Sequence, residues 1–317
     1  MKKKVLISLL LVITILTAIF STVYATDEQT EIPNKYDLRN DINIRIENQK
    51  DKPWCSRYAY VKMVETYLQK TKGLNYNLSE GYLNYSLNLG NSFMSGEYVL
   101  EDDFPNIEYP VTEANTKKFN EATEKAVIKN VGLYLNDIDN NKIKEYIMKY
   151  GSIELSIFNT DNQWNNYKGG IYHKDMGNIS QAKKHAVSII GWDDNYSRNN
   201  FVYEKPEKDG AWLVLNSWGT NWGNNGTAWL SYEDYFGVKG TLISLIGSLT
   251  LSDGEIIETK LEDKKQEEIK KTEIPVIEQE TIEPTKTNNM QNIFIIVFAV
   301  AVILLIIGII LKSKKHK

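Results

Sequence analysis

The spacing of apolar residues predicts helices early in the chain and strands later. After Cys55, apolar residues recur at the spacing of one helix face, in the pairs Ala59/Tyr60, Met63/Val64 and Tyr67/Leu68. Pro53 suits the start of this helix, and Gly73 suits its end. The stretch "NKIKEYIMKY", residues 141–150, predicts a second helix that ends at Gly151.

The second half of the chain has the pattern of strands. Apolar residues alternate in "SIELSIF", and three short apolar runs are typical of buried strands: "HAVSIIGW" (185–192), "AWLVLNSW" (211–218) and "TAWLSY" (227–232). Helices first and strands later predict an α+β fold with two lobes, the first helical and the second built from strands. A cleft between two lobes is a common place for a ligand, so we expect the functional site there.

Both ends of the chain are hydrophobic. A basic start, an apolar run over residues 5–20 and small residues near Ala25 predict a secretory signal peptide over residues 1–25. An uncleaved anchor helix is the alternative, although the run is short for a membrane span. Residues 293–311 carry no charge and are long enough to cross a bilayer, and the basic residues 312–317 favour a cytoplasmic tail. This pattern predicts a single-pass protein of the cell membrane with its main part outside the cell.

Residues 251–292 are rich in glutamate and lysine and contain no aromatic residue. Such a segment cannot bury enough apolar surface to fold by itself, so we expect a stalk that is disordered or partly helical. Residues 32–250 then form the folded domain, which we expect to be a monomer.

Composition removes several classes of function. The formal net charge of −4 and the absence of a basic stripe give no indication of nucleic-acid binding. No zinc-type cluster of cysteine and histidine is present, and "DIDNN" at 137–141 lacks the later acid that a calcium loop needs. We therefore expect neither a metal nor a cofactor. A single cysteine also means that no internal disulfide can form.

That cysteine, Cys55, is the first candidate for chemistry. A helix N-terminus favours negative charge and lowers the pKa of a thiol, which makes the reactive thiolate more abundant. A buried structural cysteine is the alternative, since free cysteine is often found in cores. A cysteine nucleophile needs a base. Of the three histidines, His316 lies in the basic tail, His173 follows "GGIY" in a loop-like position, and His185 opens a predicted strand.

The residues from 215 onward favour a catalytic role for Cys55 and His185 over a structural one. The stretch "LNSWGTNWGNNGTAWLSY" resembles the NSWGxxWGxxG segment of papain-like cysteine peptidases. Other stretches resemble that family in the same order: "IPNKYDLRN", "ENQKDKPWCSRYAYVKMVE", "NLSEGYL", "GSIELSIF" and "YKGGIY". The resemblance covers residues 32–236 and, with the predicted span, implies a bacterial, membrane-anchored member of the family.

The resemblance implies a role for individual residues. Cys55 would attack the peptide carbonyl, His185 would form an ion pair with Cys55 and then protonate the leaving amine, and Asn216 would orient the imidazole. The Gln49 side chain, six residues before Cys55, would help form the oxyanion hole. By the same analogy Trp218 would cover the bond between histidine and asparagine, and Trp222 would line the leaving-group side. Simple core packing is the alternative for both tryptophans.

The chain departs from the family pattern beside the nucleophile. The family usually has tryptophan directly after its cysteine and small residues before it, whereas Ser56 follows Cys55 here and Trp54 precedes it. Trp54 is therefore a candidate for the wall of a substrate pocket. The glycine pair that usually binds extended substrate is not evident, and Gly96 is the best candidate for that part.

These observations favour a secreted, membrane-tethered cysteine endopeptidase that acts on protein or peptide substrates. A binding or adhesion protein on a peptidase fold that has lost turnover is the first alternative, and the altered surroundings of Cys55 are its support. A peptidoglycan hydrolase of the NlpC/P60 type is the second. The Gln49 spacing and "NSWG" argue against it, because that group does not carry them.

Overall fold

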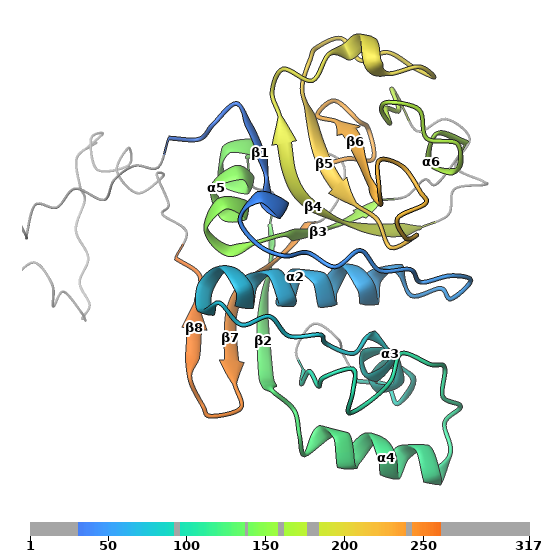
Figure 1. Ribbon diagram of the computed structural model, residues 1–317, viewed down its shortest axis with the longest axis vertical. Helices are drawn as coiled ribbons and strands as arrows, with labels where there is room; N and C mark the ends of the chain where they lie inside the picture. Colours follow the sequence, from blue (N-terminus) through green and yellow to red (C-terminus); the bar gives the residue numbers. More distant parts are fainter. Residues whose placement is uncertain are drawn as a thin grey trace, which may run out of the picture. The chain divides into compact units, whose positions relative to one another are not determined.

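A long helix, α2 (Cys55–Lys72), runs through the middle of the fold, with α3 and α4 on one side and strands β4 to β6 on the other (Figure 1). Its side chains are buried from Tyr58 to Leu68, so it is a core helix for both sides of the molecule. It ends at Gly73, which has a left-handed φ of 68° and whose N–H donates to the carbonyls of Leu68 and Gln69. The predicted helix is confirmed, although Trp54 rather than Pro53 is its N-cap residue.

The computed structural model describes residues 31–91, 96–136, 139–157, 162–175, 184–238 and 243–260. The predicted signal peptide, the membrane span and the basic tail lie outside these ranges. Within them, no helix combines the length and the apolar character needed to cross a membrane.

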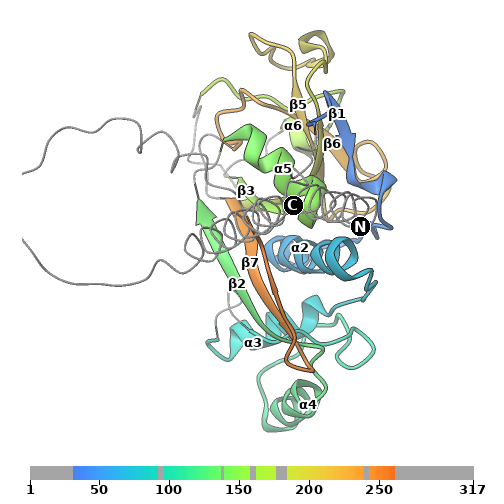
Figure 2. The same cartoon turned by 90° about the vertical axis from the view of Figure 1, so that its left-hand side faces the viewer.

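The helical side of the molecule is built from α3 (Glu80–Asn88) and α4 (Glu113–Thr123) (Figure 2). Both helices contribute to one aromatic cluster. Ser79 starts α3 by accepting a hydrogen bond from Tyr82 N at 2.8 Å. The cluster joins rings from both helices and from the segment between them: Tyr82, Tyr85, Phe104 and Phe119. The sequence pattern had not predicted α4.

The strands form one antiparallel sheet in the order β2-β7-β3-β4-β5-β6, with β1 beside β4 and β8 beside β7. Their bounds are β1 Lys35–Asp37, β2 Ile128–Asn136, β3 Ile153–Ile157, β4 His185–Asp193, β5 Ala211–Leu215, β6 Thr227–Ser231, β7 Ile243–Leu251 and β8 Ile256–Glu258. The four predicted strands correspond to β3, β4, β5 and β6. The described residues also form the helices α5 (Asn140–Tyr150) and α6 (Asn162–Asn165) and the short 3-10 turns η1 (Leu38–Asn40) and η3 (Arg198–Asn200).

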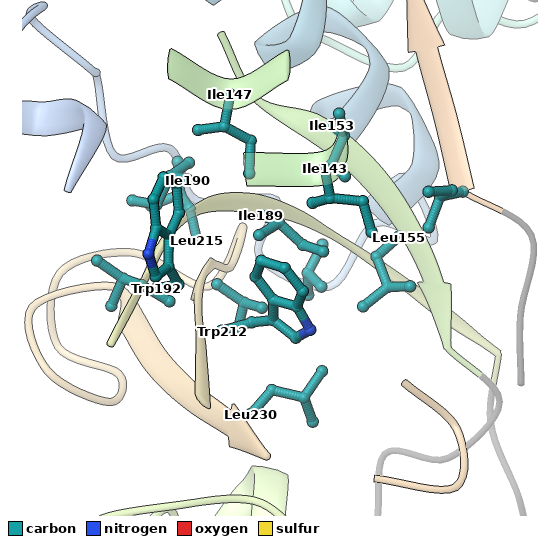
Figure 3. Close-up of a cluster of buried hydrophobic side chains, with 14 of the residues drawn as sticks. Ile143, Ile147, Ile153, Leu155, Ile189, Ile190, Trp192, Trp212, Leu215 and Leu230 are labelled. Atoms are coloured by element: carbon teal, nitrogen blue, oxygen red, sulfur yellow. The ribbon is translucent and has the colours of Figure 1, made fainter. Parts of the chain in front are cut away.

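The largest core lies between α5 and the sheet (Figure 3). Ile143 and Ile147 from α5 point toward side chains of β3, β4 and β5, and Trp192 and Trp212 are almost fully buried among them. A second core joins α2 to β2 and β7. Because α2 and β4 both belong to packed cores, the first residue of each is held on a rigid element.

The folded part of the chain extends beyond the predicted boundary at residue 250. After β7, a turn at Gly254 (φ 90°) returns the chain as β8, which pairs with β7 through Ile256, Ile257 and Glu258. Thr259 is buried and donates to Ile246 O at 2.6 Å. The start of the predicted stalk at residue 251 therefore belongs to the sheet, because two isoleucines and a glycine turn complete a hairpin.

Candidate active site

Cys55 is the first residue of α2 and carries a partly exposed, free thiol. The helix N-terminus presents backbone N–H groups that have no partner within the helix, and it is the positive end of the helix dipole. Helix α2 packs against β4, and Tyr58 and Ala59, one turn after Cys55, line a cavity of about 20 Å³ together with Ala186 and Asn216. The start of the helix thus faces the start of β4.

His185 is the first residue of β4 and is buried, with 6% of its surface exposed. Asn216 directly follows the neighbouring strand β5, and its Oδ1 lies 2.8 Å from His185 Nε2. The antiparallel pairing of Ser188 with Leu215 sets this register, which brings together two side chains far apart in sequence.

The hydrogen bonds around Asn216 determine the tautomer of His185. Asn216 Oδ1 also accepts from Ser217 N at 2.8 Å, so this atom is the amide oxygen and not the nitrogen. His185 Nε2 must therefore donate the hydrogen in its bond with Asn216. In a neutral imidazole this leaves Nδ1 as the acceptor, ready to take the proton of a thiol.

Burial lowers the pKa of His185 to about 4, and the hydrogen bond with Asn216 opposes this shift only in part. The resting imidazole is therefore uncharged at neutral pH. An uncharged imidazole whose Nδ1 carries no hydrogen can act as a base. Once protonated, it can act as an acid.

Gln49 is held from two directions in the segment before α2. Its Oε1 accepts from Ser217 Oγ at 2.6 Å, and its Nε2 donates to Lys52 O at 2.6 Å. The backbone adds a bond from Gln49 N to Ser217 O at 2.7 Å. A primary amide has two N–H bonds, so the bond to Lys52 leaves one for another acceptor. This fixed donor on the segment before Cys55 is what an oxyanion hole requires.

Aromatic rings enclose His185. The Trp218 ring lies 5.0 Å from the imidazole, and the Trp164 ring meets it edge-on at 6.0 Å. Trp222 stacks on Trp164 at 5.9 Å and donates from Nε1 to Trp164 O at 2.7 Å. These rings exclude water from the bond between His185 and Asn216, which strengthens that bond by lowering the local dielectric.

Two glycines of the NSWG segment are required by backbone geometry. Gly219 has a φ of 77°, and a Cβ there would meet Asn48 Nδ2 at 2.8 Å. Gly226 has a φ of 83°, and a Cβ there would meet Ile46 Cγ2 at 2.4 Å. The loop from Asn216 to Gly226 therefore packs closely on the chain that leads to Gln49, which accounts for glycine at these motif positions.

The remaining predicted residues lie in different surroundings. Trp54 is buried, with 2% of its surface exposed, and the Lys52 ammonium sits over its ring at 4.4 Å. Gly96 lies between α3 and β2, two residues before Tyr98, whose N–H donates to Ile128 O at 3.0 Å. No described contact joins Gly96 to His185.

His173 occupies a separate place from His185. Its Nδ1 and its backbone N each lie 2.8 Å from Asp234 Oδ2, and both residues are buried. This pair ties the segment before residue 176 to the turn after β6. Among the described residues, no group of three or more His, Cys, Asp or Glu side chains could hold a metal ion.

Comparison with known proteins agrees with this geometry. A family model described as papain family cysteine protease matches residues 32–243, which is more than half of the chain. The chain belongs to the papain family of cysteine proteases. The predicted papain-like α+β fold, with helices first and an antiparallel sheet later, is confirmed.

The chain spans less than two thirds of the length of each of three relatives. Falcipain-2b of Plasmodium falciparum (isolate 3D7) is 30% identical over 194 residues, which is 57% of this chain and 38% of that protein. Mouse (Mus musculus) cathepsin K is 26% identical over 223 residues, 66% of this chain and 63% of the relative. The clostridial cysteine protease Cwp84, in a form obtained after propeptide cleavage, superimposes with a TM-score of 0.57 at 25% identity, covering 69% of this chain and 58% of that one.

Sequence reasoning missed several residues around the site. Ser217 lies inside the quoted motif, but its bonds to Gln49 and Asn216 appear only when the loop is folded. Arg57, in the first turn of α2, has its pKa lowered by burial, and the neighbouring Cys55 opposes that shift.

Proposed function

We propose that this chain is a cysteine endopeptidase tethered to the cell membrane, with its catalytic domain outside the cell. The observation that carries the proposal is the bond of 2.8 Å between His185 Nε2 and Asn216 Oδ1, which leaves His185 Nδ1 as the basic atom of the ring. The family match supports the chemistry. The uncharged run at residues 293–311 supports the tether.

The proposed reaction uses the thiol of Cys55, the imidazole of His185 and the side-chain amide of Gln49. Cys55 transfers its thiol proton to His185 Nδ1, and the thiolate attacks the peptide carbonyl carbon. Gln49 Nε2 and the backbone N–H of Cys55 donate to the oxyanion that forms. The imidazolium then gives its proton to the leaving amine, and an acyl group remains on Cys55 until water, activated by His185, hydrolyses it.

Asn216 and Trp218 support these steps without touching the reacting carbon. Asn216 Oδ1 keeps the hydrogen on Nε2 while Nδ1 gains and loses its proton. The ring of Trp218 lies against the imidazole and shields that hydrogen bond. Trp222 remains a candidate for the leaving-group side of the site. Trp54 and Gly96 remain candidates for substrate contacts.

The extracellular setting rests on the two terminal segments and on one structural relative. The predicted signal peptide at residues 1–25 would export the chain, and residues 293–311 would hold it in the membrane. Another Cwp84 structure, at a TM-score of 0.56 and 25% identity, is described as that of a surface-layer-associated protein of Clostridium difficile. A cell-surface location for this chain is consistent with that relative.

The test uses an epoxide inhibitor of papain-like enzymes on purified protein, with and without Cys55→Ala. We expect covalent labelling and casein digestion by the wild type and neither by Cys55→Ala, with unchanged thermal unfolding. Labelling without digestion would favour the binding protein that has lost turnover. Release of peptidoglycan fragments in place of casein digestion would favour a wall hydrolase and overturn the proposal.

A further inference from the structure

The segment between Gln49 and Cys55 is a turn that faces both sides of the molecule. On the sheet side it is fixed by Gln49, whose backbone and side chain both bond to Ser217. Within the turn, Lys50 has a left-handed φ of 55°, and its N–H donates to Asn48 Oδ1 at 2.8 Å. The side chains of Lys50, Asp51 and Pro53 are exposed.

Lys52 provides the connection to the helical side. Its Nζ donates to the backbone oxygen of Asn106 at 2.6 Å and lies 4.4 Å above the ring of Trp54. Asn106 is itself fixed at the start of α3, where its Oδ1 accepts from Gly81 N at 2.6 Å and its Nδ2 donates to Glu80. The ammonium therefore bridges a rigid helix start and the buried N-cap residue of α2.

The backbone of the same lysine orients the candidate oxyanion donor. Lys52 O accepts from Gln49 Nε2 at 2.6 Å and from Trp54 N at 2.8 Å. The direction of the second Gln49 N–H thus depends on where this carbonyl lies, and the carbonyl is fixed by the side chain of its own residue. An oxyanion hole is sensitive to small displacements, because donors must meet the position that the oxygen takes in the transition state.

We propose that Lys52 is a positioning residue for the oxyanion hole: its ammonium ties the turn to Asn106 and Trp54, and its carbonyl then aims the Gln49 amide at the substrate oxygen. This inference rests on the proposed peptidase function. Lys52 does not touch the substrate and acts through Gln49. The bond requires a long cationic side chain at this position.

The test compares Lys52→Met, which keeps the length of the side chain but removes the charge, with Lys52→Arg and with the matched control Lys50→Met in the same turn. We expect Lys52→Met to lower kcat for a peptide substrate by roughly tenfold, while KM stays within about twofold. Lys52→Arg should recover most of the loss, and Lys50→Met should match the wild type. The rate of Cys55 alkylation by iodoacetamide, which needs no oxyanion hole, should be unchanged in all three.

A double-mutant cycle with Gln49→Ala separates positioning from a general loss of structure. If Lys52 acts through Gln49, Lys52→Met should change kcat by less than about twofold once Gln49 is alanine. An equal loss in both backgrounds, or equal losses of hydrolysis and alkylation, would overturn the inference.

Hydrogen exchange gives a readout that does not depend on turnover. The backbone amides of residues 49–52 and of Trp54 should exchange faster in Lys52→Met than in wild type or Lys52→Arg, and equal exchange would also overturn the inference. A wild-type protein that hydrolyses no peptide would contradict the proposed function instead, and the exchange measurement would still decide whether Lys52 holds the turn.

Discussion

At the scale of single residues, the site is defined by which atom donates and which accepts. The Ser217 N–H identifies the oxygen of Asn216, and that oxygen in turn assigns the hydrogen on His185. The sequence motif names these residues but does not contain their hydrogen bonds. The same limit applies to Trp54: its place beside Cys55 makes it a candidate for a pocket wall, but the motif does not show that its ring is buried beneath the Lys52 ammonium.

His185→Ala and His173→Ala should differ in what they impair. His185→Ala should reduce kcat by at least about a hundredfold, because the site loses its base and its acid. His173→Ala should keep kcat per folded molecule but lose roughly 3 kcal/mol of stability, because the buried Asp234 loses the imidazole and keeps only backbone N–H donors. Active-site titration with kcat and chemical unfolding of each variant measure the two effects. Loss of turnover in folded His173→Ala would show that the base is misassigned.

At the scale of elements, the sequence pattern predicted the helices and strands whose apolar residues recur with a clear helical or strand period. The helix after Cys55 and the strands β3 to β6 have clear periodicity, and Gly73 marks a real helix end. Strands β2 and β7 were not predicted, since each depends on a partner more than a hundred residues away, and their pairing contains register shifts at Ile128/Asn130 and Gly132/Leu133. Such pairing cannot be read from a local window.

Two glycine substitutions compare a helix end, where only a positive φ favours glycine, with the motif loop, where a neighbouring side chain also leaves no room for a Cβ. Gly73→Ala should cost about 1 kcal/mol of stability and leave kcat unchanged, because its Cβ meets nothing within 4 Å and only the positive φ is unfavourable. Gly226→Ala should cost more and also lower kcat, because its Cβ would collide with Ile46 and move the loop that carries Asn216. Thermal unfolding and steady-state kinetics decide. Equal effects from the two variants would contradict the close packing of the loop.

At the scale of the whole molecule, buried carboxyl groups where α3 packs against α2 make the stability of the fold depend on pH. Burial, and to a lesser degree the nearby Glu65, raise the pKa of Glu80 to about 8, although Lys62 opposes this shift. Glu65 itself is buried and accepts from Lys62 Nζ at 2.7 Å and from Arg45. Glu80 is therefore uncharged at neutral pH, although the sequence shows only a glutamate in a helix-start motif.

Glu80→Gln should reduce the pH dependence of stability. Between about pH 4.5 and pH 8 the folded protein holds a proton on Glu80 that the unfolded chain has released, so the free energy of unfolding falls as pH rises through this window. This contribution should amount to about 3 kcal/mol between roughly pH 5 and pH 8, and glutamine, which cannot ionise, should remove it. Urea unfolding of both proteins at several pH values measures the difference. Parallel pH profiles would show that Glu80 is ionised in the folded state.

The end of the folded part decides where the membrane tether can be removed. A chain that stops after residue 262 keeps β8, the pairing of Ile257 with Leu249 and the hydrogen bonds of Thr259. Among these bonds, Thr259 N donates to Gly247 O at 2.8 Å and Thr259 Oγ1 donates to Ile246 O at 2.6 Å. A chain that stops after residue 250 loses all of these. We expect the longer form to enter the medium with wild-type kcat/KM, because it lacks the uncharged run at 293–311.

The shorter form should be at least about 3 kcal/mol less stable, since it exposes an apolar face and leaves β7 without its edge partner. Fractionation, thermal unfolding and kinetics of both forms measure these outcomes. The longer form remaining with the membrane would point to an uncleaved N-terminal anchor, and equal stability of the two forms would place the end of the domain at residue 250.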